Sequence, residues 1–109
     1  MNDAEVEQLK ELYDPEKLFL LDFSAEWCGP CQTMIPVLDH LKKRIHEKLN
    51  IVTIDVDRYP QAAMVFKIMS LPTFILYKKG EELWRRGGLL TVREFEEAIS
   101  RVKSEEIKE

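Results

Sequence analysis

An apolar stretch that runs directly into the only two cysteines of the chain constrains this sequence more than any other feature. In the expected strand at 17–23, residues 18–23 carry apolar side chains at both alternating sets of positions, with Asp22 as the exception. Strands covered on both faces show this pattern. The corner Trp-Cys-Gly-Pro-Cys follows at 27–31, and residues 29–49 then place apolar side chains at helical spacing. We therefore expect a strand, a tight corner with both cysteines, and a long helix.

The remainder of the chain continues with short strand and helix patterns. Further strands are expected at 50–56, 73–77 and 82–86, and further helices at 3–13, 60–68 and 92–102. A strand, a crossover helix and a strand make the first two strands parallel, whereas a short turn makes the last two antiparallel. This order predicts an α/β fold with a mixed four-stranded sheet and helices on both faces. In the helix expected at 60–68, Met64 and Val65 are among the residues available for burial.

Length and charge limit the functions that this chain can have. A chain of 109 residues is long enough for one domain, and we expect a single domain over 1–109. The formal net charge is −4 and Lys and Arg form no dense cluster, which argues against nucleic-acid binding. No apolar run is long enough to span a membrane. The first residues lack the basic and apolar regions of a signal peptide, so a cytoplasmic location is expected.

The two cysteines could bind a metal, form a structural disulfide or undergo redox cycling. A structural zinc site needs four ligands, but no second cysteine pair exists, and His40 and His46 cannot share one helical face. A structural disulfide that closes so short a loop removes little entropy from the unfolded chain. We therefore favour redox cycling between a dithiol and a disulfide, and expect no metal.

Redox cycling has a direct physical basis in this sequence. Cys28 lies at the N-terminus of the expected helix, where free N–H groups and the helix dipole stabilise an anion. A stabilised thiolate has a lowered pKa and is the nucleophile that attacks a disulfide. Pro30 suits the first helical turn, because an N–H at that position has no helical partner. Cys31, one turn further and expected to be less exposed, would then resolve the mixed disulfide.

Resolution by the second cysteine requires a proton acceptor, and Asp22 is the candidate. A carboxylate in an apolar strand is desolvated, and desolvation raises its pKa toward neutrality, which suits a general base. The alternative is that Asp22 is simply ion-paired or lies on an exposed strand face.

The run 22–31 resembles the active-site signature of the thioredoxin family. Leu71-Pro72-Thr73 is similar to the cis-proline segment of that family, and the resemblance extends over residues 17–100. It implies a thioredoxin-like fold in which Cys28 attacks, Cys31 resolves and Asp22 is the buried acid. The family usually begins with an edge strand. If one precedes the first helix here, the sheet has five strands.

The resemblance also implies further site residues, partners and an activity. Residues that would tune the site or receive an extended substrate are Trp27, Gly29, Pro30, Leu71, Pro72, Gly88 and Leu89. The implied activity is that of a monomeric protein-disulfide reductase and dithiol electron carrier without a bound cofactor. Its partners would be disulfide-containing proteins and a thioredoxin reductase, although a ferredoxin-linked enzyme is also compatible. A thiol oxidase or isomerase, and a binding module with incidental thiols, remain as alternatives.

Three positions depart from the pattern of the family. Thr53 stands where many members have a lysine beside the buried acid, so the pKa of Asp22 should depend mainly on burial. Ser24 replaces an aromatic residue next to the cysteines, which makes that wall smaller. Met69 adds a soft apolar side chain where a polar residue is common.

Overall fold

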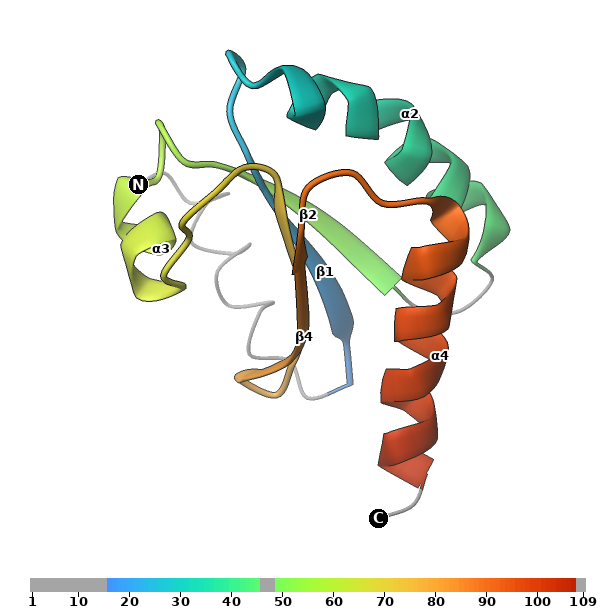
Figure 1. Cartoon of the computed structure of the whole chain (residues 1–109). Helices are drawn as coiled ribbons and strands as arrows, with labels where there is room; N and C mark the ends of the chain where they lie inside the picture. Colours follow the sequence, from blue (N-terminus) through green and yellow to red (C-terminus); the bar gives the residue numbers. More distant parts are fainter. Residues whose placement is uncertain (1–15, 46–48, 108–109) are drawn as a thin grey trace.

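The computed structural model of the protein describes residues 16–45 and 49–107. The helix expected at 3–13, and any strand before it, lie outside these residues. The elements are β1 (Leu18–Ser24), α2 (Gly29–Arg44), β2 (Leu49–Asp55), α3 (Pro60–Val65), β3 (Thr73–Lys78), β4 (Glu81–Gly87) and α4 (Val92–Ile107), coloured in this order in Figure 1. No helix in the described part of the chain is long and apolar enough to cross a membrane.

The four described strands form one mixed sheet in the order β2-β1-β3-β4. β1 pairs with β2 in parallel and with β3 antiparallel, and β3 and β4 form an antiparallel hairpin. The prediction of a mixed four-stranded sheet is confirmed. β1 is central and apolar on both faces, and all its residues except Ser24 are buried. The strand that leads into the cysteines is therefore fixed in place by pairing on both of its edges and by burial of both of its faces.

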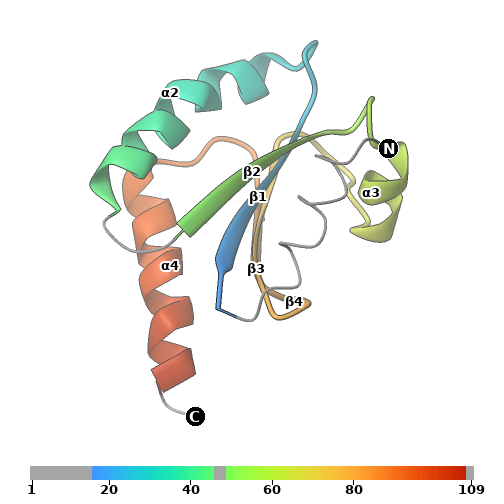
Figure 2. The same ribbon diagram turned by 180° about the vertical axis from the view of Figure 1, so that it is seen from behind.

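Helices cover both faces of the sheet, as expected. α2 and α4 lie on one face and α3 lies on the other (Figures 1 and 2). The side chains of β1 alternate accordingly. Leu18 and Leu20 pack with residues of α2 and α4, whereas Phe19, Leu21 and Phe23 pack on the side of α3. This alternation is what the period of a strand requires.

α4 begins with a reciprocal cap. The backbone N–H of Glu94 donates to Thr91 Oγ1 at 3.1 Å, and the N–H of Thr91 donates to Glu94 Oε1 at 3.1 Å. Two free donors of the first turn are satisfied in this way. The cap fixes where the helix begins, and its inner face then buries Phe95 against Phe74, with ring centroids 5.0 Å apart.

All three described helices end elsewhere than expected from the sequence, and α4 runs to Ile107 rather than to 102. α2 ends at Arg44 rather than at 49, because Ile45 already has an extended backbone and residue 49 opens β2. α3 ends at Val65, and the expectation that Met64 and Val65 are buried is wrong, since they are 77% and 76% exposed. In a helix this short only one face meets the sheet, and here Ala62 supplies it together with Phe66 just beyond the helix.

Candidate redox site

Cys28 and Cys31 form a disulfide at the N-terminus of α2. Their Cα atoms are 5.3 Å apart. Cys28 is the N-cap residue of the helix, and its sulfur accepts a hydrogen bond from the N–H of Cys31 at 3.2 Å. The backbone of Cys28 is tied to the preceding turn, because its N–H donates to the carbonyl of Ala25. The first turn of the helix therefore offers a donor to the sulfur that the sequence assigns as nucleophile.

The surroundings of the disulfide are largely apolar. Ala25 and both cysteines form a small buried cluster, against which Val56 and Leu71 pack. Each cysteine is 5% exposed in this disulfide form, so the expected difference in their exposure is not found.

Gly29 and Pro30 are exposed at the surface beside the disulfide. Pro30 occupies the first turn of α2, where its lack of an N–H leaves no partner unsatisfied. A Cβ at position 29 would meet no atom within 4 Å. This opening leaves room for another chain to approach the backbone next to Cys28.

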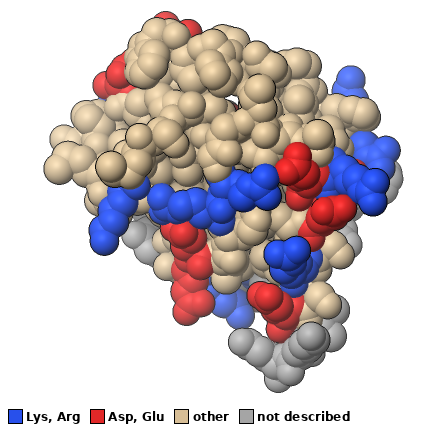
Figure 3. Space-filling model, in the orientation of Figure 1, with Lys and Arg blue, Asp and Glu red and all other residues tan. Residues whose placement is uncertain are grey.

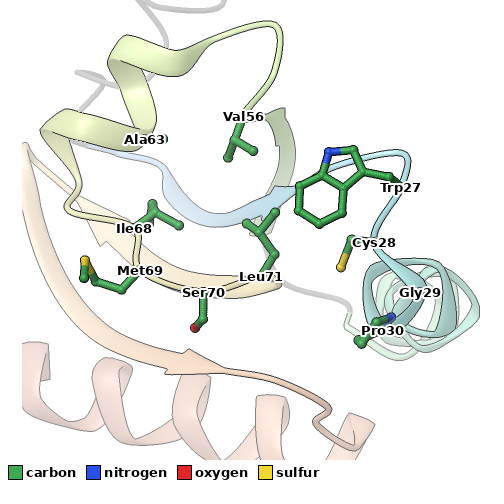
Figure 4. Close-up of a pocket in the computed structure, with 10 residues that line it drawn as sticks. All are labelled: Trp27, Cys28, Gly29, Pro30, Val56, Ala63, Ile68, Met69, Ser70 and Leu71. Carbon is green, nitrogen blue, oxygen red and sulfur yellow. The ribbon is translucent and has the colours of Figure 1, made fainter.

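A groove of uncharged residues lies next to Cys28. It is lined by Trp27, Cys28, Gly29, Pro30, Val56, Ala63, Ile68, Met69, Ser70 and Leu71. Figure 4 shows the residues of the cysteine corner on one side of the groove and those of segment 68–71 on the other. Figure 3 shows the molecule in the orientation of Figure 1. The upper part of the face in view is mostly uncharged (tan), while most charged side chains gather lower on the molecule.

The groove brings together several of the expected site residues but not all. Trp27, Gly29, Pro30 and Leu71 line it, together with Met69. Val56, Ala63 and Ile68 line it as well and were missed. They are ordinary apolar residues of β2, α3 and their flanks, and only their place in the fold brings them to the disulfide.

Pro72, Gly88 and Leu89 lie outside the lining of this groove. The peptide bond between Leu71 and Pro72 is cis, as the resemblance implied, and the ring of Pro72 is buried. The carbonyl of Pro72 accepts a hydrogen bond from the N–H of Gly88 at 3.0 Å. Gly88 has a φ of +84°, which favours glycine. Leu89 is 62% exposed on the loop that follows.

Trp27 forms the exposed rim beside Cys28. Its side chain is 71% exposed, yet its indole N–H donates to the carboxylate of Asp57 at 2.8 Å. Asp57 lies in the turn after β2. This bond joins the cysteine corner after β1 to the turn after the neighbouring parallel strand β2, and it fixes an aromatic surface in place without burying it.

Asp22 is buried in the middle of β1, with 7% of its surface exposed. It alternates with Leu18 and Leu20, so its side chain lies on the face that α2 covers. Burial raises the pKa of Asp22 to about 6, while a hydrogen bond from Thr53 Oγ1, at 3.4 Å, acts in the lowering direction. The expectation that burial dominates this pKa is confirmed. A carboxyl group with this pKa changes its protonation near neutral pH.

No group of three or more metal-ligating side chains occurs among residues 16–45 and 49–107. The site itself consists of a disulfide, a buried carboxyl group and an uncharged groove. These features, on a mixed sheet between two helical layers, define a protein with a thioredoxin-like fold and a disulfide of CxxC spacing at a helix N-terminus.

Comparison with known proteins gives the family. Residues 3–101 match the thioredoxin family model. Thioredoxin Y1 of Arabidopsis thaliana, a chloroplastic protein, is 42% identical over 88 residues, which cover 81% of this chain and 51% of that protein. The thioredoxin of Rickettsia typhi is 31% identical over 88 residues, which cover 81% of this chain and 84% of that protein. The chain belongs to the thioredoxin family.

A solved structure supports the same assignment. The crystal structure of thioredoxin NaTrxh from Nicotiana alata matches with a TM-score of 0.80 and 32% sequence identity. The match covers 93% of this chain and 86% of that one. The chain spans about half the length of the Arabidopsis relative, which carries additional sequence.

Proposed function

We propose that this protein reduces disulfides in other proteins and carries electrons between dithiols. The observation that carries the proposal is the Cys28–Cys31 disulfide at a helix N-terminus, open to an uncharged groove. The helix end stabilises a thiolate once the disulfide is reduced. The groove is suited to an extended polypeptide, because it presents apolar side chains and no charge next to the reacting sulfur.

The reaction proceeds in two exchange steps. The Cys28 thiolate attacks one sulfur of a substrate disulfide, forms a mixed disulfide and releases the other substrate sulfur as a thiolate. The Cys31 thiol then loses its proton, and its thiolate attacks the sulfur of Cys28. The substrate leaves with both sulfurs reduced, and the two electrons have come from the cysteine pair. Asp22 is the proposed acceptor of the Cys31 proton, since its pKa of about 6 lets it exchange protons near neutral pH.

The proposed substrate contacts lie around the disulfide. Trp27 and Leu71 would contact the substrate from the groove, and Pro72, Gly88 and Leu89 would do so from the adjoining loops. Gly29 and Pro30 separate the cysteines, so their conformational freedom would influence the ease of disulfide formation.

We further propose that the chain 1–109 acts as a monomeric single domain without a bound cofactor. Its disulfide must be reduced again after each turnover, and a thioredoxin reductase is the proposed donor. A reducing compartment such as the cytoplasm suits this role, because its thiol pools do not reoxidise the dithiol. The named relatives come from chloroplasts as well as bacteria, so the location depends on this redox argument rather than on them.

Replacement of each cysteine tests the function. Reduction of insulin disulfides, driven by a dithiol, should be lost in both Cys28→Ser and Cys31→Ser. Only Cys31→Ser should accumulate a mixed disulfide with insulin, because Cys28 is still able to attack. Unchanged reduction in Cys28→Ser would contradict the proposal. Wild-type protein that binds a partner but reduces no disulfide would instead be a binding module.

A further inference from the structure

Arg85 joins β4 to the end of α3, two segments that are distant in the sequence. Its Nη2 donates to the carbonyl of Phe66 at 2.6 Å, and its Nη1 lies 3.4 Å from the carbonyl of Lys67. The same guanidinium is held by Glu82, with Nε to Oε2 at 3.0 Å and Nη2 to Oε1 at 2.7 Å. A bidentate pair of this kind fixes the orientation of the guanidinium plane. Arg85 can therefore hold two backbone carbonyls at set positions.

A β-bulge brings the two charged residues together. In a regular strand, residues 82 and 85 would point to opposite faces. The pairing of β3 with β4 shifts register between Leu76 and Tyr77, so that Leu76 pairs with Trp84 while Tyr77 pairs with Glu82. The extra residue, Leu83, packs with Trp84 on the side of α4. Bulges redirect side chains in this way.

The register places Glu82 and Arg85 on the side of α3. Tyr77 and Ile75, their pairing partners on β3, both belong to the apolar cluster of that side. Phe66 packs in the same cluster. The guanidinium thus reaches the end of α3 along the surface of this cluster.

The two carbonyls that Arg85 binds lie where the helix ends. Phe66 is the C-cap of α3, and Lys67 has a φ of +54°, an uncommon value for a residue other than glycine. Carbonyls at a helix end lack helical partners and attract positive charge. Arg85 satisfies them, and the chain then turns directly into the segment 68–71.

That segment is the wall of the groove opposite the cysteine corner. Ile68, Met69, Ser70 and Leu71 all line the groove, and Figure 4 shows this segment across from Trp27 and Cys28, with Leu71 nearest to them. Arg85 itself does not line the groove. We infer that the Glu82–Arg85 pair, aimed by the bulge in β4, positions this wall and so sets the affinity of the groove for polypeptide substrates. Arg85 is a positioning residue, and its role rests on the proposed function.

The neighbouring Arg86 provides a matched control. It is adjacent on the same strand, but its register partner Phe74 belongs to the opposite face, and it pairs with Glu94 at 2.9 Å. Its side chain is 51% exposed and that of Arg85 is 33% exposed. Each arginine therefore has one acidic partner, but only Arg85 holds the wall of the groove.

The test compares two substrates in Arg85→Met and Arg86→Met. Insulin needs the groove, whereas hydroxyethyl disulfide is too small to contact its far wall. With Arg85→Met, the KM for insulin should rise about three- to tenfold, the size expected for indirect coupling. The kcat and the rate with hydroxyethyl disulfide should stay within about twofold. Arg86→Met should leave all three values within the same range.

Further variants distinguish positioning from a general loss of stability. Glu82→Gln should raise the KM for insulin by a smaller factor, and Arg85→Lys should recover part of the loss. If Arg85→Met does not fold, Glu82→Gln carries the test. An unchanged KM, or an equal loss with both substrates, would overturn the inference.

Hydrogen exchange separates this inference from the proposed function. Amides of segment 68–71 should exchange faster in Arg85→Met than in Arg86→Met, at a temperature well below unfolding. Equal exchange would overturn the positioning role even in an active protein. A third outcome is that segment 68–71 exchanges faster in Arg85→Met while the wild-type protein reduces neither substrate. That outcome would keep the positioning role and reject only the reductase function.

Discussion

The indole N–H of Trp27 donates to the carboxylate of Asp57 at 2.8 Å, although the indole is 71% exposed. Asp57→Leu removes this acceptor and should let the ring move away from Cys28. We expect the kcat/KM for insulin to fall about three- to tenfold, roughly the net value of one ordinary hydrogen bond. Asp57→Asn keeps an acceptor oxygen and is the control. Equal losses in the two variants would show that the charge of Asp57, and not the hydrogen bond, matters.

The buried carboxyl group of Asp22 should make stability depend on pH. Its pKa is about 6 in the folded protein, against 3.8 for an aspartate side chain in water, so the folded protein binds the proton more tightly than the unfolded chain. Stability from this group is therefore complete below about pH 4 and is lost as pH rises through 6. Since a tenfold change in proton affinity is about 1.4 kcal/mol, ionised Asp22 costs about 3 kcal/mol.

Asp22→Asn removes that cost. Urea unfolding should show the oxidised variant to be about 2–3 kcal/mol more stable than wild type at pH 8, with little difference at pH 4. The same gain at both pH values would contradict the pKa of Asp22.

Thr53 offers a second test of that carboxyl group. Its hydroxyl lies 3.4 Å from Asp22 Oδ2 and acts to lower the pKa. Thr53→Val should raise the pKa of Asp22 further, and Thr53→Lys should lower it, because a nearby cation favours ionisation. A carboxyl titration followed by NMR measures both, with the exposed Ser100→Ala as the control. Identical titrations in the two Thr53 variants would leave burial as the sole determinant.

The core beneath α4 should be sensitive to loss of an aromatic ring. Phe95 is 1% exposed, and its ring contacts Phe74 at 5.0 Å and Trp84 at 6.2 Å between centroids. Phe95→Ala should lower the free energy of unfolding by about 3–5 kcal/mol. The exposed ion-pair variant Arg93→Ala should change it by less than about 1 kcal/mol. A loss at Phe95 no larger than that of the control would mean that the cavity collapses.

Local chemistry explains what the sequence could predict. The strand–corner–helix stretch and the alternation of β1 each depend on residues within a few positions of one another, and the structure confirms them. The raised pKa of Asp22 followed in the same way, because a carboxyl group in an apolar strand is buried wherever the strand is central.

Features that need tertiary structure were not predictable. The end of α2 and the exposure of Met64 and Val65 depend on where each helix meets the sheet. The Glu82–Arg85 pair requires a bulge, without which the two side chains would point apart. The lining of the groove combines the cysteine corner, the turn after β2, α3 and the segment before β3, and no local sequence signal links them.

The reduction potential of the Cys28–Cys31 couple tests the central claim most directly. The protein would be equilibrated with glutathione or dithiol buffers at neutral pH, and its free thiols would be counted. We expect a value close to that typical of thioredoxins, about −270 mV, at which the dithiol is a strong enough reductant for protein disulfides. A value between about −180 and −120 mV would contradict the account, because such a couple donates or isomerises disulfides instead of reducing them.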